Sequence, residues 1–249
     1  MAEPTFSVDL EALLEAGCHF GHQARRWNPK MGQFIYTERD GVHIFDLAKT
    51  ATQLEAACVE LYEAGKLGKN VVFVGTKRQA QEIVREHAID AGAMFIVTRW
   101  PAGLITNWEQ VGKSISKLNQ MKKDREEGKF SKYTKFEQVK FDKQINKLER
   151  FFGGVSTLKR IPDMLVIADI NTDLVAIKEA NIKEVPVLAI ADSNTDPDLV
   201  KIAVPGNDDA VGSIKILIST LAAAYKQGKS LSRSQEEKAP EAKPEAKKE

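Results

Sequence analysis

Four short, continuous apolar runs constrain the fold more than any other feature of the 249-residue sequence. They span residues 70–74, 94–98, 164–168 and 185–191 and are rich in Val, Ile and Phe. None alternates apolar with polar residues, as a strand with one exposed face would. Strands that are apolar throughout belong to sheets covered on both faces, which are mostly parallel. We therefore predict a mainly parallel sheet buried between two layers.

Helical patterns lie beside these runs, and strands that alternate with helices predict an α/β three-layer sandwich. The expected helices span residues 49–64, 78–91, 174–180 and 210–225, the last ending before Gly228. Small polar residues are common N-caps, so Thr76 is predicted to cap the second helix and Asn171 or Thr172 the third. Asp40-Gly41 favours a tight turn, which predicts a β-hairpin from residues 33–36 and 42–47.

Residues 107–157 show a different pattern, with two narrow apolar stripes on otherwise charged helices. Apolar residues recur there every three or four positions, at Trp108, Val111, Ile115, Leu118 and Met121 and at Phe141, Ile145, Leu148 and Phe152. Two such helices joined by a short loop predict an inserted antiparallel helical hairpin, or coiled coil. The globular domain would then comprise residues 1–106 and 158–225, and residues 226–249 would form a disordered charged tail.

Charge is separated along the chain although the net charge is only +1. Residues 113–160 hold 14 Lys and Arg against 6 Asp and Glu, so 14 − 6 = +8. Residues 161–225 hold 4 Lys against 10 acids, which gives 4 − 10 = −6. Such a chain can present one strongly positive face. The basic segment is either a solvated helical surface or a surface that binds phosphate backbones.

Several classes of protein are disfavoured by the sequence. No apolar run approaches 18 residues, so we expect no membrane span, and the N-terminus has no signal-peptide pattern. Two cysteines, Cys18 and Cys58, form no disulfide framework and fit a reducing cytoplasm. Gly75-Thr76-Lys77-Arg78 lacks the spacing of a phosphate loop.

Two groups of polar residues are candidates for a metal site. Cys18, His19 and His22 lie at helical spacing, although His19 is equally consistent with a partly buried, hydrogen-bonded histidine. Asp192, Asp196 and Asp208 follow the fourth apolar run, where ligands of α/β proteins bind, although turn and helix-cap chemistry also explains them. A structural Mg²⁺ or Zn²⁺ held by His19, Asp192, Asp196 and Asp208 is a candidate, and no cofactor is required.

A basic and aromatic loop is the strongest candidate for binding. Its members are Arg25, Arg26, Trp27, Asn28 and Lys30, followed by Arg39. Arginines mixed with aromatics suit phosphate contacts and base stacking, and Asn28-Pro29 favours a loop. The alternative is a surface loop whose Trp27 packs on the core. Arg99-Trp100 lies where the insertion leaves the body and is predicted to set its angle.

Several segments resemble the ribosomal protein S2 family, the second protein of the bacterial small ribosomal subunit. The resemblance covers nearly the whole chain before residue 226. It rests on residues 13–22, 25–31, 38–46, 75–77, 99–100, 106–107, 192–198 and 205–210, which occur in the family's order. Ala102, where the family has a glycine, and residues 169–172, where it is more basic, depart from the pattern.

The resemblance implies an α/β sandwich with an inserted helical hairpin, bound to small-subunit rRNA at the head–body junction. It also implies a cytoplasmic, ribosome-bound protein that helps to dock the large mRNA-binding first protein of the small subunit and contacts neighbouring ribosomal proteins. No enzyme activity, membrane or small-molecule substrate is expected. The arginine loop and the hairpin lysines would contact phosphates, the latter being Lys113, Lys117, Lys122 and Lys123.

Two other functions remain open from the residues alone. One is a metal-dependent phosphoesterase that uses Asp192, Asp196 and Asp208. The other is a docking module whose helical hairpin binds a partner helix with its apolar stripe; it is compatible with RNA binding, and we expect both.

Overall fold

The structure is a computed structural model that describes residue 6 and residues 8–236. Its centre is a five-stranded sheet in the order β5-β4-β6-β7-β8, and every neighbouring pair is parallel. The strands are β4 (Val71–Val74), β5 (Met94–Ile96), β6 (Met164–Ile167), β7 (Val187–Ala191) and β8 (Ile202–Pro205). The α/β class and the parallel sheet are therefore confirmed. The four predicted runs form four of these strands, whereas β8 was not predicted.

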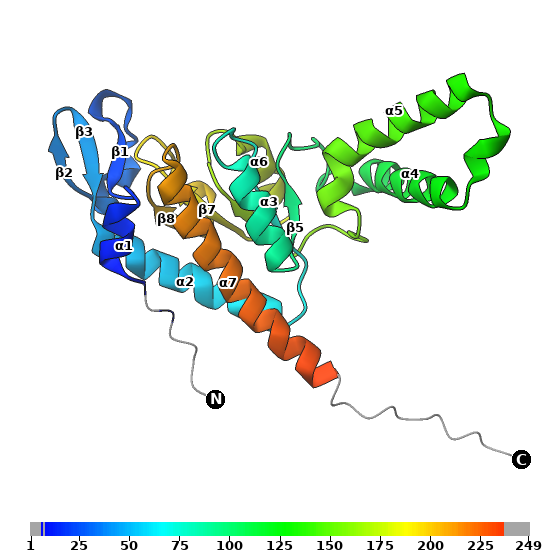
Figure 1. The fold of residues 1–249 in the computed structure, drawn as a ribbon. Coiled ribbons are helices and arrows are strands. Elements are labelled where there is room, and N and C mark those ends of the chain that lie inside the picture. Colours follow the sequence, from blue (N-terminus) through cyan, green and yellow to red (C-terminus); the bar gives the residue numbers. More distant parts are fainter. Residues whose placement is uncertain (1–5, 7, 237–249) are drawn as a thin grey trace, which may run out of the picture.

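Both faces of this sheet are covered (Figure 1). One face packs against α1 (Leu10–Glu15), α2 (Leu47–Lys66), α3 (Gln81–Asp90) and α7 (Val211–Glu236). The other face packs against α6 (Leu174–Ile182) and the segment before the insertion. Alternate residues of one strand face the two cores: Val71 and Phe73 lie in the first, and Val72 and Val74 lie in the second. This explains why the strands lack polar residues.

Helix α7 is longer than predicted, and the boundary between helix and tail at residue 226 is wrong. The helix runs to Glu236 and passes through Gly228. A methyl group at Gly228 would overlap the carbonyl oxygen of Tyr62, and one at Gly65 would lie 2.5 Å from the carbonyl oxygen of Tyr225. These glycines thus let α2 and α7 touch backbone to backbone, so Gly228 serves helix packing and not helix termination. The rest of the predicted tail, residues 237–249, lies outside the described residues.

A smaller antiparallel sheet lies at the N-terminal end, with the order β1-β3-β2. It consists of β1 (Phe20–Gln23), β2 (Ile35–Arg39) and β3 (Val42–Phe45). Asp40 and Gly41 both have positive φ angles, of 52° and 74°, as a two-residue hairpin turn requires. The hairpin prediction is confirmed, although β1 was not expected. The helical metal-binding pair predicted from Cys18, His19 and His22 is wrong, because His22 lies in this strand and Cys18 and His19 lie in the turn before it.

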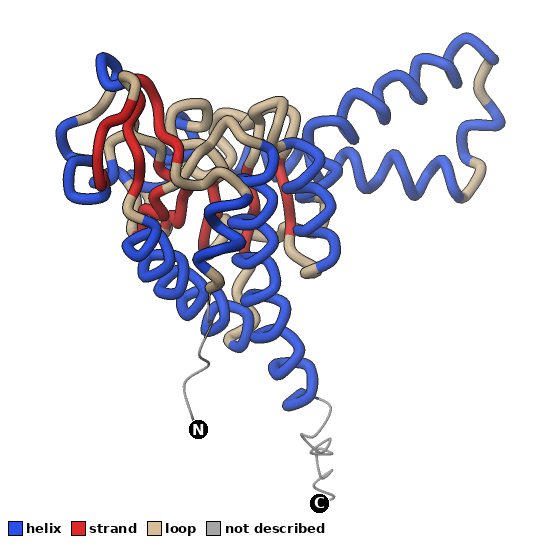
Figure 2. The backbone as a smooth tube through the Cα atoms, turned by 60° about the vertical axis from the view of Figure 1, so that its left-hand side comes forward, coloured by secondary structure: helices blue, strands red, loops and turns tan. Residues whose placement is uncertain are grey.

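The insertion between β5 and β6 consists of α4 (Trp108–Glu126) and α5 (Lys135–Phe152), joined by a short 3-10 helix (Lys129–Lys132). The two helices lie side by side and project from the body (Figures 1 and 2). Leu118, Met121 and Ile145 form their shared core together with Phe130, Phe141, Leu148 and Phe152. The two apolar stripes bury each other, so the alternative in which this stripe binds a partner helix is wrong. We call α4, α5 and their connection the arm.

Two predicted helix caps are also wrong. Thr76 does not cap α3, which begins at Gln81 after Ala80; its hydroxyl donates instead to Asp173, 2.8 Å away. Helix α6 begins after Asp173 and not after Thr172. Asp169 accepts hydrogen bonds from the Thr172 amide and hydroxyl, at 3.1 and 2.6 Å, which holds that residue in a turn before the helix. Buried carboxylates are stronger acceptors than hydroxyls and decide where these helices begin.

None of the described helices combines the length and the apolar character that crossing a bilayer requires.

Candidate nucleic-acid interface and carboxylate cluster

The arginine loop is exposed but rigidly attached to the body. Arg25 and Arg26 are exposed in a 3-10 turn that follows β1 directly. The Arg25 Nε donates to the side-chain oxygen of Gln23 at 3.0 Å, and neither arginine pairs with a carboxylate in the described part of the chain. The Asn28 amide donates to the carbonyl of Ser193 at 2.7 Å, which fixes the loop to the end of the large sheet. The loop therefore presents two exposed guanidinium groups, neither paired with an acid, on a backbone fixed to the body.

The structure supports part of each interpretation of Trp27, as a ligand contact and as a residue packed on the core. Its side chain is 41% exposed, and its ring meets His43 edge-on with centroids 5.0 Å apart. Gly32 lies against the ring, since a methyl group there would be 3.4 Å from it. One side of the indole thus packs on the body while a large part remains available to a ligand.

Lys30 and Arg39 differ in the partners they have within the chain. Lys30 pairs with Asp196 and Asp198, both at 2.8 Å, and these hydrogen bonds raise the pKa of its ammonium group. Asp196 thus serves an ion pair at the surface. Arg39 is 83% exposed, with its Nε 3.9 Å from a carboxylate oxygen of Asp40. Of the two, Arg39 keeps more of its charge available for an external phosphate.

The four predicted arm lysines also fall into two kinds. Lys113 and Lys117 are exposed on α4 and form no ion pair within the described residues. Lys113 lines a groove of about 930 Å³ at the base of the arm, together with Trp108 and Lys159. Lys122 pairs with Glu149 of α5, and Lys123 lies 3.8 Å from Glu127. Half of the predicted set is therefore neutralised inside the arm.

A second polar site lies at the carboxyl ends of the parallel strands. Lys77 follows β4, Asp169 follows β6, Asp192 follows β7 and Asp208 follows β8. The Lys77 Nζ lies 2.6 Å from Asp208, 2.7 Å from Asp209 and 3.1 Å from Asp169. We call these residues, with His22, the carboxylate cluster. Parallel strands bring the ends of distant segments together here, so the sheet topology assembles the cluster.

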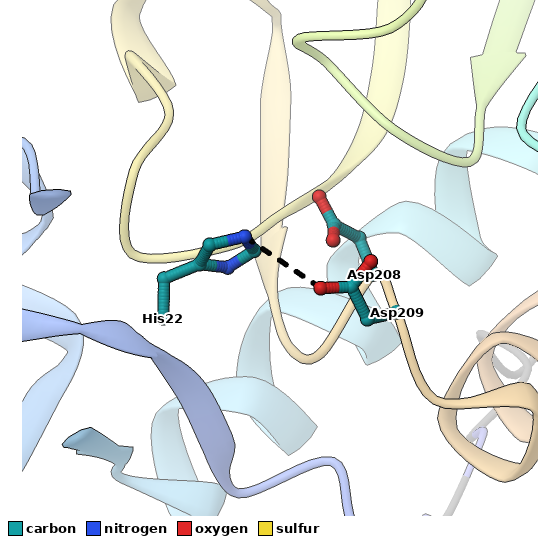
Figure 3. Close-up of side chains that lie close together, drawn as sticks. All are labelled: His22, Asp208 and Asp209. Atoms are coloured by element: carbon teal, nitrogen blue, oxygen red, sulfur yellow. Dashed lines mark ion pairs between the residues drawn. The ribbon is translucent and has the colours of Figure 1, made fainter.

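His22 connects the cluster to the N-terminal sheet. Its Nδ1 is 3.0 Å from Asp192 and its Nε2 is 3.6 Å from Asp209. Figure 3 shows the imidazole directed at Asp209, with Asp208 beside it. The hydrogen bond to Asp192 raises the pKa of the His22 imidazole, and the neighbouring carboxylates add to this effect. His22 is thereby favoured in its charged form.

The titration of the other members follows from burial and charge. Burial raises the pKa of Asp208 to about 7, and the nearby charges of Asp169 and Asp192 act in the same direction. Burial opposes the charged form of Lys77, but its hydrogen bonds to Asp208 and Asp209 outweigh it and raise the pKa. The cluster thus shares few positive charges among many carboxylates, which makes Lys77 its central counter-ion.

The predicted metal set is only partly assembled by the structure. Asp192 and Asp208 meet in the cluster, but Asp196 binds Lys30, and His22 takes the place predicted for His19. The His19 ring lies against the Phe20 ring, tilted by 41° with centroids 4.0 Å apart, and its Nδ1 is buried without a hydrogen-bond partner in the described chain. His22, Asp208 and Asp209 offer donor atoms within 4.8 Å of one another, a combination that suits a divalent ion. Asp208 and Asp209, however, already form ion pairs with the Lys77 ammonium group.

A third polar group, missed from the sequence, fixes the base of the arm. The Glu179 carboxylate, from α6, is almost fully buried. It accepts hydrogen bonds from the Trp100 indole at 3.0 Å, from the Gly103 amide at 2.7 Å and from the Thr106 hydroxyl at 3.1 Å. Burial opposes its ionisation, but these donors and the amides of Ile105 and Thr106 outweigh burial and lower its pKa. Trp100 is therefore a packed, structural residue.

These features define an α/β protein with a helical insertion, whose buried carboxylates are paired with cations or hydrogen-bond donors and whose Arg25 and Arg26 have no acidic partner among the described residues. The comparisons agree with that class. The family model described as ribosomal protein S2 matches residues 13–228. The small ribosomal subunit protein uS2 of Roseiflexus sp. (strain RS-1) is 45% identical over 221 residues, which cover 89% of this chain and 84% of that protein.

A second relative gives the same result. The small ribosomal subunit protein uS2c of Cyanophora paradoxa is 43% identical over 221 residues, or 89% of this chain and 95% of that protein. The chain therefore belongs to the ribosomal protein S2 family. It is a structural protein of the small ribosomal subunit that acts in translation, and it is not an enzyme. This finding removes the phosphoesterase alternative.

Proposed function

We propose that the chain is an rRNA-binding scaffold of the small ribosomal subunit, and that the arginine loop and the arm are its RNA contacts. The observation that carries the proposal is the free, exposed pair Arg25 and Arg26 on a loop fixed to the body. Guanidinium groups on a rigid backbone bind phosphates without the cost of ordering the loop. Asp192 and Asp209 line a pocket together with these arginines, but they are engaged by His22 and Lys77 and form no ion pair with the loop in the described part of the chain.

Several finer features belong to the same proposal. The arm is an antiparallel coiled coil formed by residues 107–157, inserted into a body formed by residues 1–106 and 158–236, since α7 continues to Glu236. Its mutually buried stripes support this division. The protein works in the cytoplasm, contacts neighbouring small-subunit proteins and helps to dock the large mRNA-binding first protein of the subunit. Membership of the family supports these roles.

Sedimentation with a salt wash tests the scaffold function. The chain should co-migrate with the small subunit in a sucrose gradient of cell lysate and should dissociate progressively as salt is raised, because phosphate contacts release counter-ions. Arg25→Ala combined with Arg26→Ala should weaken binding to purified small-subunit rRNA. It should also reduce the slope of log K against log salt by about one unit per lost contact. A chain that stays at the top of the gradient in low salt would contradict the proposal.

Docking of the first protein is tested separately by pull-down. Immobilised full-length chain should retain the purified first protein in the absence of RNA. Retention only after small-subunit rRNA is added would show that RNA alone connects the two proteins.

A further inference from the structure

Helix α5 has an outer face that differs from the face packed against α4. At 3.6 residues per turn, the apolar stripe of Phe141, Ile145, Leu148 and Phe152 lies on one side of the helix. The opposite side carries Phe136, Val139, Lys140, Lys143, Lys147 and Arg150. All six of these side chains are exposed. We call them the outer face of α5.

The cations of the outer face have no acidic partners. Lys140, Lys143, Lys147 and Arg150 form no ion pair in the described part of the chain. The acids of α5 lie elsewhere and are engaged: Glu137 belongs to the capping box with Thr134, Asp142 lies 3.9 Å from Arg125, and Glu149 pairs with Lys122. The four cations follow one another at intervals of 3, 4 and 3 residues. They form a row about 15 Å long.

Exposed apolar groups continue this row to the free end of the arm. Phe136 is 68% exposed and Val139 is 50% exposed, and Tyr133 lies just before the helix with 40% exposure. The Lys140 Nζ lies 4.4 Å from the centroid of the Phe136 ring. Aromatic rings interleaved with lysines are the combination that contacts unpaired bases beside a phosphate backbone.

We infer that the outer face of α5 docks an RNA strand, with its four cations on successive phosphates and Phe136 against an unpaired base or its sugar. The inference rests on the proposed function and places the contact on α5, whereas the sequence pointed to α4. The charge of the face favours a polyanion. The face also lacks an apolar centre, and protein interface cores are depleted in lysine, so RNA fits it better than a protein does.

Binding of the full-length chain to purified small-subunit rRNA over a series of KCl concentrations tests the inference. The test variant is Lys140→Gln, Lys143→Gln, Lys147→Gln and Arg150→Gln together. The control removes the same charge from exposed, unpaired lysines of the body: Lys69→Gln, Lys178→Gln, Lys183→Gln and Lys215→Gln. The test variant should reduce the slope of log K against log salt by about three to four units, and the control by less than about one.

A second pair of variants separates stacking from charge. Phe136→Ala should weaken rRNA binding about fivefold or more without changing the salt slope, and Phe136→Trp should retain binding. Circular dichroism should show an unchanged fold for every variant, because the outer face takes no part in the core of the arm.

The outcomes distinguish this inference from the proposed function. If the α5 variant keeps the wild-type slope while Arg25→Ala with Arg26→Ala reduces it, the chain binds RNA elsewhere and the inference falls. If neither variant changes RNA binding, the proposed function falls as well. If the α5 variant binds rRNA normally but fails to assemble into small subunits, the face contacts a protein, and the inference is again overturned.

Discussion

The carboxylate cluster and the outer face of α5 are both rich in charged side chains, but the charges are paired in the cluster and unpaired on α5. In the cluster, Lys77 is mostly buried and has three carboxylates within 3.1 Å. On α5, four cations lie exposed in a row with no acid beside them. Charge placed among partners inside the fold contributes to the fold, whereas charge left without partners costs a little stability and is available to a ligand. The difference separates structural from binding residues where both are charged.

The largest expected effect is that of removing the counter-ion of the cluster. Lys77→Met should lower the free energy of unfolding by about 3–5 kcal/mol, because Asp169 and Asp208 would remain buried without a cation. Urea denaturation measures the loss. Adding Asp208→Asn to Lys77→Met should recover part of it. If Lys77→Met leaves stability unchanged, the cluster is not held together by charge pairing.

The next effect concerns the base of the arm. Glu179→Ala should lower the free energy of unfolding by about 2–3 kcal/mol, because the Trp100 indole and the loop amides would lose their shared acceptor. Lys178→Ala, an exposed neighbour on α6, is the matched control and should have little effect. Thermal denaturation followed by circular dichroism compares the two. Equal melting temperatures would show that the base of the arm does not depend on Glu179.

The pH dependence of the free energy of unfolding reports the protonation of Asp208 and His22. Burial raises the pKa of Asp208 in the folded state to about 7 from an ordinary value of 3.8, so the folded state binds a proton more tightly than the unfolded state. This contribution is complete below pH 3.8 and is lost as pH rises through about 7. His22, also raised, acts in the same direction. Stability should therefore fall by about 1 kcal/mol between pH 6 and pH 8.

Urea titrations at the two pH values measure this change, and the Asp208→Asn variant should show a smaller one. A wild-type stability that rises over the same interval would mean that the cluster does not favour the protonated carboxyl.

The smallest expected effect has the opposite sign. Lys143→Gln with Lys147→Gln should raise the free energy of unfolding by about 0.5 kcal/mol, because it relieves repulsion between like charges one helical turn apart. Denaturation at low and high salt checks the cause, since the gain should vanish when salt screens the repulsion. A loss of stability comparable to that of Lys77→Met would remove the contrast between the two regions.

The sequence by itself determined the parallel sheet, the tight turn at Asp40-Gly41 and the paired helices of the arm. Each depends on a local pattern: continuous apolar runs, a dipeptide that tolerates positive φ angles, and stripes at helical spacing. The exposure of Arg25 and Arg26 was also predicted, although Asn28-Pro29 does not form an irregular loop: Asn28 caps a short 3-10 helix, Pro29–Phe34, with its side chain accepting from the Lys30 amide.

Only the tertiary structure decided which polar residues meet. His22 joins Asp192, 170 positions away, because β1 lies beside the end of β7, and no local pattern distinguishes it from His19. Gly228 continues α7 because α2 passes against it, and Glu179 binds the amides of a loop more than 70 residues earlier. The pairing of Lys122 and the freedom of Lys143 likewise depend on the neighbouring helix. Pairing, burial and the pKa shifts that follow from them are set by distances in space, which a one-dimensional pattern does not contain.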